Sequence, residues 1–151
     1  MSLKPPFTEE TARQKVKIAQ GFWNTKEPTN IAKAYTENSI WRNRDQFLTG
    51  TNAIVDFLTK KWEKEKSYRL RKELFAFTDN KIAVQFWYEY QDAYDGMKWK
   101  RCYGLEDWTF AEDGRMRKRQ MSGNDIELTE DERWFKEGMD VESVPISEAH
   151  W

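Results

Sequence analysis

The sequence predicts an α+β domain built on a curved antiparallel sheet. Residues 81–121 hold three strand-like segments, separated by Asp95-Gly96 and Asp113-Gly114. Asp-Gly favours hairpins because glycine adopts the positive φ of primed turns at little cost. The first of these strands carries aromatic side chains on both faces, whereas a sheet with one face in water alternates apolar and polar residues. We therefore expect a concave face that holds a pocket and an opposite face that meets helices or a second subunit.

Two helices are expected before the sheet. Residues 8–24 place apolar side chains at helical spacing, and Thr8 suits the N-cap because its hydroxyl can accept a hydrogen bond from a free backbone N–H. Pro28 then suits the start of a short second helix, because proline is tolerated in the first turn. Its apolar residues are Ile31, Ala34 and Tyr35.

Residues 39–47 alternate as a polar strand with Asn43 and Asp45 on one face. Thr51 is expected to cap a third helix, whose apolar stripe ends at Trp62. The run KKWEKEK at the end of this helix is typical of a solvated face with ion pairs between successive turns. Residues 68–78 form a strand whose alternation changes phase, which a β-bulge near Glu73 explains.

The chain changes character after Met121. Residues 124–142 are strongly acidic, and their main apolar side chains are Trp134 and Phe135. We expect one domain over residues 1–128 and an acidic tail over residues 129–151, made of a short helix and an extended part. The tail either docks on the same domain, docks on a partner subunit, or remains solvated.

Composition narrows the class of protein. A chain of 151 residues fits one domain, and a net charge of −1 does not favour a nucleic acid or a membrane surface as partner. No segment has the length of a signal peptide or membrane helix, so a cytoplasmic protein is expected. The single cysteine, Cys102, excludes an internal disulfide. No metal-ligand spacing, glycine-rich loop after a strand or Ser-His pair is present, so we expect no cofactor and no metal.

The order of elements resembles the nuclear transport factor 2-like fold of ketosteroid isomerases, scytalone dehydratase and SnoaL-type cyclases. The segments AYTENSIWRNRDQFLTGTNAIVDFLTKKW, ELFAFTDNKIAVQFWYEYQD and RCYGLEDWTFAEDGRMRKRQMSGND are similar to an uncharacterised SnoaL-like branch, and they cover most of residues 31–125. The resemblance implies a cystatin-like cone, in which a curved sheet wraps against a long helix and leaves an apolar cavity. It also implies a homodimer. It does not define a reaction, because this fold hosts isomerases, dehydratases, cyclases and binding modules.

The first candidate base is Asp45. In the related isomerases a general-base aspartate follows the second helix, and by alignment Asn43 occupies that position here. An amide cannot take a proton from a carbon acid at neutral pH, so Asp45 is the nearest replacement. The alternative is an ion pair of Asp45 with Arg42 or Arg44.

Three further carboxylates lie on the central strands: Glu89, Glu106 and Asp107. If two of them converge in an apolar cavity, repulsion and desolvation raise the pKa of one, which gives an acid and a base. The alternative is that each pairs with an arginine across the sheet, and the arginines within reach are Arg101, Arg117 and Arg119.

The aromatic residues complete the predicted pocket. Tyr88, Tyr90 and Tyr103 are candidate hydrogen-bond donors to a substrate carbonyl, as tyrosines are in this superfamily, or plain packing residues. Trp41, Trp62 and Trp108 are expected to line the cavity, unless they fill it. Asn124 follows the last strand, where it caps a turn or places an amide at the rim.

Two functions remain open at this point. The first is a cofactor-independent lyase or isomerase acting on a small, largely apolar molecule, with Asp45, Glu89 or Glu106 as base and a tyrosine such as Tyr88 as donor. The second is a non-catalytic ligand-binding or dimerising module in which these carboxylates form structural ion pairs. Unpaired carboxylates in the cavity would favour the first function, and fully paired ones the second.

Overall fold

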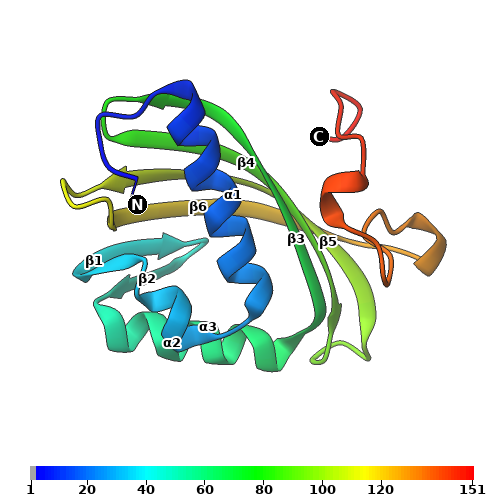
Figure 1. The fold of residues 1–151 in the computed structure, drawn as a ribbon. Coiled ribbons are helices and arrows are strands. Elements are labelled where there is room, and N and C mark those ends of the chain that lie inside the picture. Colours follow the sequence, from blue (N-terminus) through cyan, green and yellow to red (C-terminus); the bar gives the residue numbers. More distant parts are fainter. Residues whose placement is uncertain (1–2) are drawn as a thin grey trace.

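The structure, a computed structural model, describes residues 3–151 and has the α+β cone architecture (Figure 1). The helices are α1 (Glu9–Thr25), α2 (Pro28–Ala32) and α3 (Thr51–Lys64). The strands are β1 (Tyr35–Asn43), β2 (Gln46–Thr49), β3 (Glu65–Thr78), β4 (Lys81–Asp92), β5 (Lys98–Phe110) and β6 (Met116–Glu127). The sheet has the order β2-β1-β6-β5-β4-β3; β1 and β6 are parallel, and every other pair is antiparallel.

Helix α1 lies across the concave face of the sheet (Figure 1). The Thr8 hydroxyl accepts a hydrogen bond from the Thr11 N–H at 3.1 Å, so the predicted N-cap is confirmed. The buried stripe of the helix includes Val16 and Trp23, and burial of each such side chain contributes roughly 1.5–3 kcal/mol.

Polar side chains of α1 also cover the free edge of β3. Asn24 exchanges two hydrogen bonds with the backbone of Leu70, at 2.9 and 3.0 Å. The Gln20 side-chain oxygen accepts from the Lys72 N–H at 2.8 Å. An edge strand whose N–H and C=O groups are occupied in this way is protected from pairing with another chain.

The predicted strand over residues 39–47 is instead a hairpin of β1 and β2. Arg44 and Asp45 form its turn, and Arg44 has φ 59°. Asp45 is therefore an exposed turn residue and does not share a strand face with Asn43. The alternation hid this turn because no glycine marks it, although an L residue rarely adopts a positive φ.

Two further boundaries differ from the prediction. Helix α3 begins at Thr51, but its N-cap is Gly50 and no side chain caps it. Strand β3 begins at Glu65, three residues earlier than expected, directly after the helix. Its register shifts lie between Lys66 and Arg69 and between Leu74 and Ala76; the second is next to the bulge predicted near Glu73. The two Asp-Gly hairpins are as predicted, with Gly96 at φ 60° and Gly114 at φ 90°.

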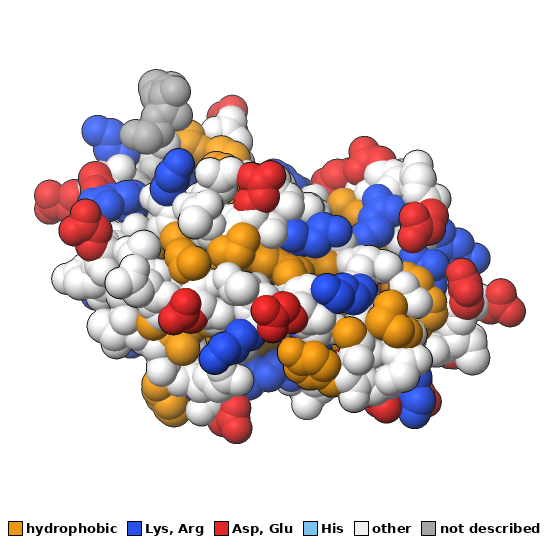
Figure 2. Space-filling model, turned by 90° about the horizontal axis from the view of Figure 1, so that it is seen from below, with side chains coloured by type: hydrophobic (Ala, Val, Ile, Leu, Met, Phe, Trp, Pro, Cys, Tyr) orange, Lys and Arg blue, Asp and Glu red, His pale blue; other side chains and the backbone are white. Residues whose placement is uncertain are grey.

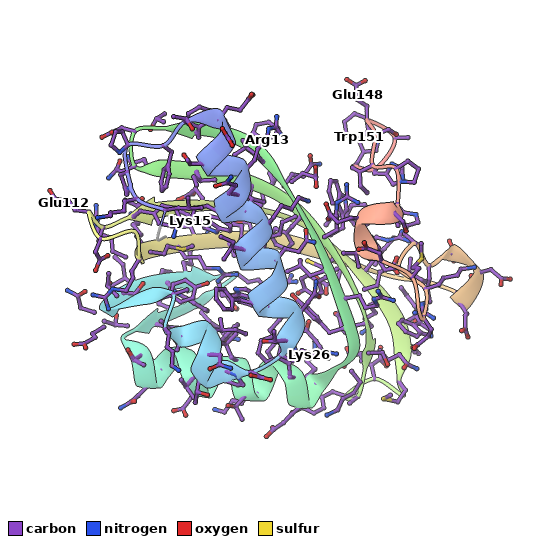
Figure 3. All side chains as sticks on the ribbon, viewed as in Figure 1. Arg13, Lys15, Lys26, Glu112, Glu148 and Trp151 are labelled. Atoms are coloured by element: carbon purple, nitrogen blue, oxygen red, sulfur yellow. The ribbon has the colours of Figure 1, made fainter. Side chains whose placement is uncertain are left out.

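The C-terminal segment, residues 129–151, packs on the outer face of the sheet, opposite to α1 (Figure 1). It contains two 3₁₀ turns, Glu130–Glu132 and Val141–Ser143, in place of the predicted short helix. Its apolar side chains form a second cluster with Trp87 of β4: Phe135, Val141 and Val144. Figure 3 shows Glu148 and Trp151 at the far end of this segment, remote from Lys15 of α1 and from Lys26, which directly follows that helix.

No helix in the described part of the chain is long and apolar enough to cross a membrane.

Candidate ligand-binding cleft

A cleft of about 1080 Å³ opens between α3, the β1-β2 hairpin and the ends of β4, β5 and β6. Its lining combines rings with charged and amide side chains, including Asn43, Phe57, Lys61, Tyr88, Tyr90 and Asp125. The face of the molecule seen in Figure 2 likewise mixes hydrophobic side chains with charges of both signs. The size is that of a small-molecule site.

One wall of the cleft is organised by Arg44. Its guanidinium crosses from the hairpin turn to β6, where Nη1 donates to the Gly123 carbonyl at 2.7 Å and Nη2 donates to Asp125 Oδ1 at 2.5 Å. The same Nη2 lies 3.2 Å from the Cys102 sulfur and 3.4 Å from the Tyr88 hydroxyl. The positive φ of Arg44 therefore directs a cation to strands that are distant in sequence.

The Asp125 carboxylate binds both the Arg44 guanidinium and the phenol of Tyr90. The Tyr90 hydroxyl donates to Asp125 Oδ2 at 2.5 Å, so both carboxylate oxygens are occupied. Burial and this hydrogen bond raise the pKa of Tyr90 well above its usual value. Burial also raises the pKa of Tyr88, and it raises the pKa of the Cys102 thiol to about 12. At neutral pH these groups are protonated, so Cys102 is not a nucleophile.

The opposite wall is provided by α3 through Lys61. Its ammonium donates to Glu65 Oε1 at 2.8 Å and lies 4.2 Å from the centre of the Tyr88 ring. Because the Lys61 side chain is only 8% exposed, its attraction to the ring is weakly screened by water.

Below the cleft, inside the aromatic core, lies a group of three charged side chains that we call the interior charge cluster: Lys72, Glu106 and Arg119. The Glu106 carboxylate accepts from the Lys72 ammonium and, at 2.9 Å, from Arg119 Nε. Arg119 Nη1 donates to Asn43 Oδ1 at 3.1 Å. Asn43 therefore connects the cluster to the cleft that it lines.

Rings surround this cluster closely. The Lys72 ammonium lies 4.8 Å from the centre of the Phe86 ring, and the Arg119 guanidinium lies 4.5 Å from that of Trp41. Burial raises the pKa of Glu106, but the charges of Lys72 and Arg119 outweigh this and hold it below its usual range. Burial lowers the pKa of Lys72 to about 8 against the opposing charge of Glu106. Glu106 is thus an ionised, paired carboxylate.

Glu89 lies on the other side of the sheet. Its carboxylate accepts from Arg101 Nε at 2.8 Å and from the backbone N–H groups of Trp134 and Phe135, both at 2.9 Å. It anchors the C-terminal segment and does not converge with Glu106. Asp107 is exposed and accepts from Gln120.

The remaining predicted residues divide into two groups. Asn43, Tyr88, Tyr90 and Asn124 line the cleft. Trp41, Trp62 and Trp108 pack in the main core, and Tyr103 lies on the outer face against Trp134. The three indoles are part of the packed core and do not line the cleft.

Four residues of the site were missed by the sequence reasoning: Arg44, Lys61, Lys72 and Asp125. Lys72 follows Tyr68 and Leu70 at strand spacing, which is a usable signal for an inward side chain. Asp125 continues the inward alternation of Met121 and Gly123 in the same way. Arg44 gave no such signal, because its reach depends on the unmarked turn.

Solved structures with the same architecture define the class of fold. One is the epoxide hydrolase/cyclase-like enzyme SalBIII, which acts in pyran ring formation in the polyether salinomycin (TM-score 0.68, 15% identity, covering 77% of this chain and 93% of that chain). Another, from Shewanella denitrificans, is assigned as a SnoaL-like polyketide cyclase (0.64, 13%, 74% and 90%). A third, from Catenulispora acidiphila, has a ketosteroid isomerase-like fold and was solved with trimethylamine (0.63, 7%, 71% and 83%). The chain thus has the SnoaL-like cone fold.

The chain belongs to the family described as "Protein of unknown function (DUF1348)", whose model matches residues 5–136. No curated protein matches it.

Proposed function

We propose that this protein binds a small, ring-bearing molecule in the cleft. The observation that carries the proposal is the lining of the cleft. Phe57, Tyr88 and Tyr90 supply flat apolar surface, while Asn43 and Lys61 supply donors beside it. Such a combination buries a ring and fixes the orientation of its polar substituents. Since charges line the cleft as well, the ligand carries polar groups and is less apolar than the composition suggested.

The pairing of the carboxylates favours binding without chemistry over acid-base catalysis. Glu106 is paired with two cations, and Glu89 is paired with Arg101 on the opposite face of the sheet. A general base at neutral pH usually has a raised pKa, whereas the pKa of Glu106 is lowered. Paired carboxylates are what the binding hypothesis requires.

A cleft-filling substitution tests the proposal. Ala53 of α3 lines the cleft, and Ala53→Phe places a ring in it. We expect compounds found in a thermal-shift screen of small cyclic carbonyl compounds to bind the wild-type protein and to lose binding to this variant. Ala149→Phe, which makes the same change at an exposed position of the C-terminal segment, is the control. Hits that bind the Ala53→Phe variant unchanged would place the ligand elsewhere.

A cofactor-independent lyase or isomerase is the second candidate, and one observation favours it. Asp125 lines the cleft beside the phenols of Tyr88 and Tyr90, which places a carboxylate next to protonated donors. If the protein is an enzyme, Asp125→Asn abolishes conversion of a bound compound, measured by mass spectrometry, while binding is retained. Compounds that bind the wild-type protein and remain chemically unchanged would leave binding as the function.

A further inference from the structure

The interior charge cluster carries more positive than negative charge. Lys72 and Arg119 share one carboxylate, Glu106, and the side chains of all three are 0–4% exposed. The cluster therefore has a formal charge of +1 when Lys72 is protonated. The charge pairs at the cleft walls do not cancel this charge, because Lys61 is matched by Glu65 and Arg44 by Asp125. A buried charge without a partner is costly, so a complementary anion is stabilising.

The polar atoms left over in the core have the same character. Within residues 3–151, the buried side-chain atoms that lack a hydrogen-bond partner are all nitrogen donors. Two are the indole nitrogens of Trp41 and Trp62, whose rings lie 5.9 and 6.0 Å from the ring of Trp23. The Arg119 guanidinium lies 4.9 Å from the same ring. The unpaired indole N–H groups and the net positive charge of the interior charge cluster therefore lie in the same part of the core. A hydrogen-bond acceptor with negative charge would complement both.

Asn43 extends this preference for a hydrogen-bond acceptor from the core to the cleft. Arginine can only donate hydrogen bonds, so the amide oxygen of Asn43 must face Arg119 and its NH₂ group is left as the other end of the amide. Asn43 lines the cleft and is 8% exposed. No protein acceptor for this NH₂ group is found in the described part of the chain. An acceptor on a ligand at the cleft floor would meet it directly.

A cationic ligand is disfavoured at the same place. Tyrosine rings attract cations, but the Lys61 ammonium already lies over the Tyr88 ring and 4.9 Å from the centre of the Tyr68 ring. A second cation there would have to displace the Lys61 ammonium from these rings, whereas an anion would not compete for them.

We infer that the cleft is selective for a ring-bearing organic acid, whose carboxylate accepts a hydrogen bond from the Asn43 amide within the field of Lys72 and Arg119. The ring of the ligand then lies against Phe57 and Tyr88. This inference rests on the proposed function, because it assigns the chemical class of the ligand to the same cleft.

Matched acid and amide probes test the inference on the full chain. The probes are benzoate, cinnamate and 2-naphthoate, each compared with its neutral amide by titration calorimetry at pH 7. We expect at least one acid to bind the wild-type protein about tenfold or more tightly than its amide. Asn43→Asp replaces the NH₂ donor by a charged oxygen, and the new carboxylate still accepts from Arg119. It should remove the preference for the acid and leave binding of the amide within about twofold.

Two further variants make the test specific. Asn38→Asp makes the same change at an exposed position of β1, and it should keep the full preference for the acid. Lys72→Met removes the surplus charge while Glu106 keeps Arg119, so it should reduce the preference even if Asn43→Asp fails to fold. Equal affinity of the wild-type protein for acids and amides would overturn the inference and leave the proposed cleft intact. If no acid binds at millimolar concentration, the inference is wrong whether or not the screen finds neutral ligands; if the screen is empty too, the proposed function falls with it.

Discussion

At residue 106 a carboxylate lies between two cations inside an aromatic core. We predict that Glu106→Gln lowers the free energy of unfolding by about 3–5 kcal/mol at pH 7, because two buried cations lose their partner. Urea denaturation followed by tryptophan fluorescence measures this. Glu63→Gln, at an exposed position of α3, is the matched control and should change the value by less than about 0.5 kcal/mol.

The pH dependence of this effect has a definite sign. The pKa of Glu106 is lowered in the folded state from its ordinary value of 4.5, so its stabilisation is present above that pH and is lost as the pH falls. The difference between the wild-type and Glu106→Gln proteins should therefore shrink below about pH 4.5. A difference that stays constant down to pH 3 would contradict the assigned ion pairs.

Single positions differ in how far the sequence predicts them. The alternation of β4 correctly puts Tyr88 and Tyr90 on one face and Glu89 on the other. Whether Glu89 meets Glu106 depends on the register of β4 with β5, in which Glu106 is paired with Val84. Since Val84 and Glu89 point to opposite faces, the two carboxylates are separated by the sheet. That register depends on the hairpin connection, which composition does not define.

At the scale of elements, the C-terminal segment is held by backbone groups that only the folded structure brings together. Arg71 Nη1 donates to the carbonyls of Val141 and Val144 at 2.8 and 2.9 Å, and both valines pack in the cluster of Trp87. Deletion of residues 140–151 should lower the free energy of unfolding by roughly 2–5 kcal/mol, through lost apolar burial and lost hydrogen bonds. The melting temperature measures the loss, with Glu148→Ala as the exposed control. An unchanged melting temperature would refute docking.

The elements themselves were largely predictable, and the exceptions have a common cause. Asp-Gly pairs and helical periodicity located β4, β5, β6 and α1, because glycine and apolar spacing are local signals. The β1-β2 turn and the position of the C-terminal segment depend instead on long-range contacts. Arg44 is held at positive φ by partners on β5 and β6, and Glu89 captures residues that follow it by more than forty positions.

At the scale of the whole molecule, the homodimer implied by the resemblance remains a prediction. The C-terminal segment covers the part of the outer face around Trp87, so a partner has to use the part formed by β1, β6 and β5. Three large hydrophobic side chains are exposed on these strands: Leu105 at 60%, Ile126 at 45% and Ile40 at 43%. Leu105 and Ile40 point outward, because their neighbours Glu106 and Trp41 point into the cone. A stable interface would bury about 800 Å² of each subunit there.

Sedimentation velocity distinguishes the outcomes. We expect the wild-type protein to sediment as a dimer and Leu105→Glu as a monomer at the same micromolar concentration, because the new charge would be buried without a partner. Ile18→Glu, on the exposed side of α1, makes the same kind of change away from the outer face and should leave the dimer intact. A wild-type protein that sediments as a monomer would contradict the predicted homodimer.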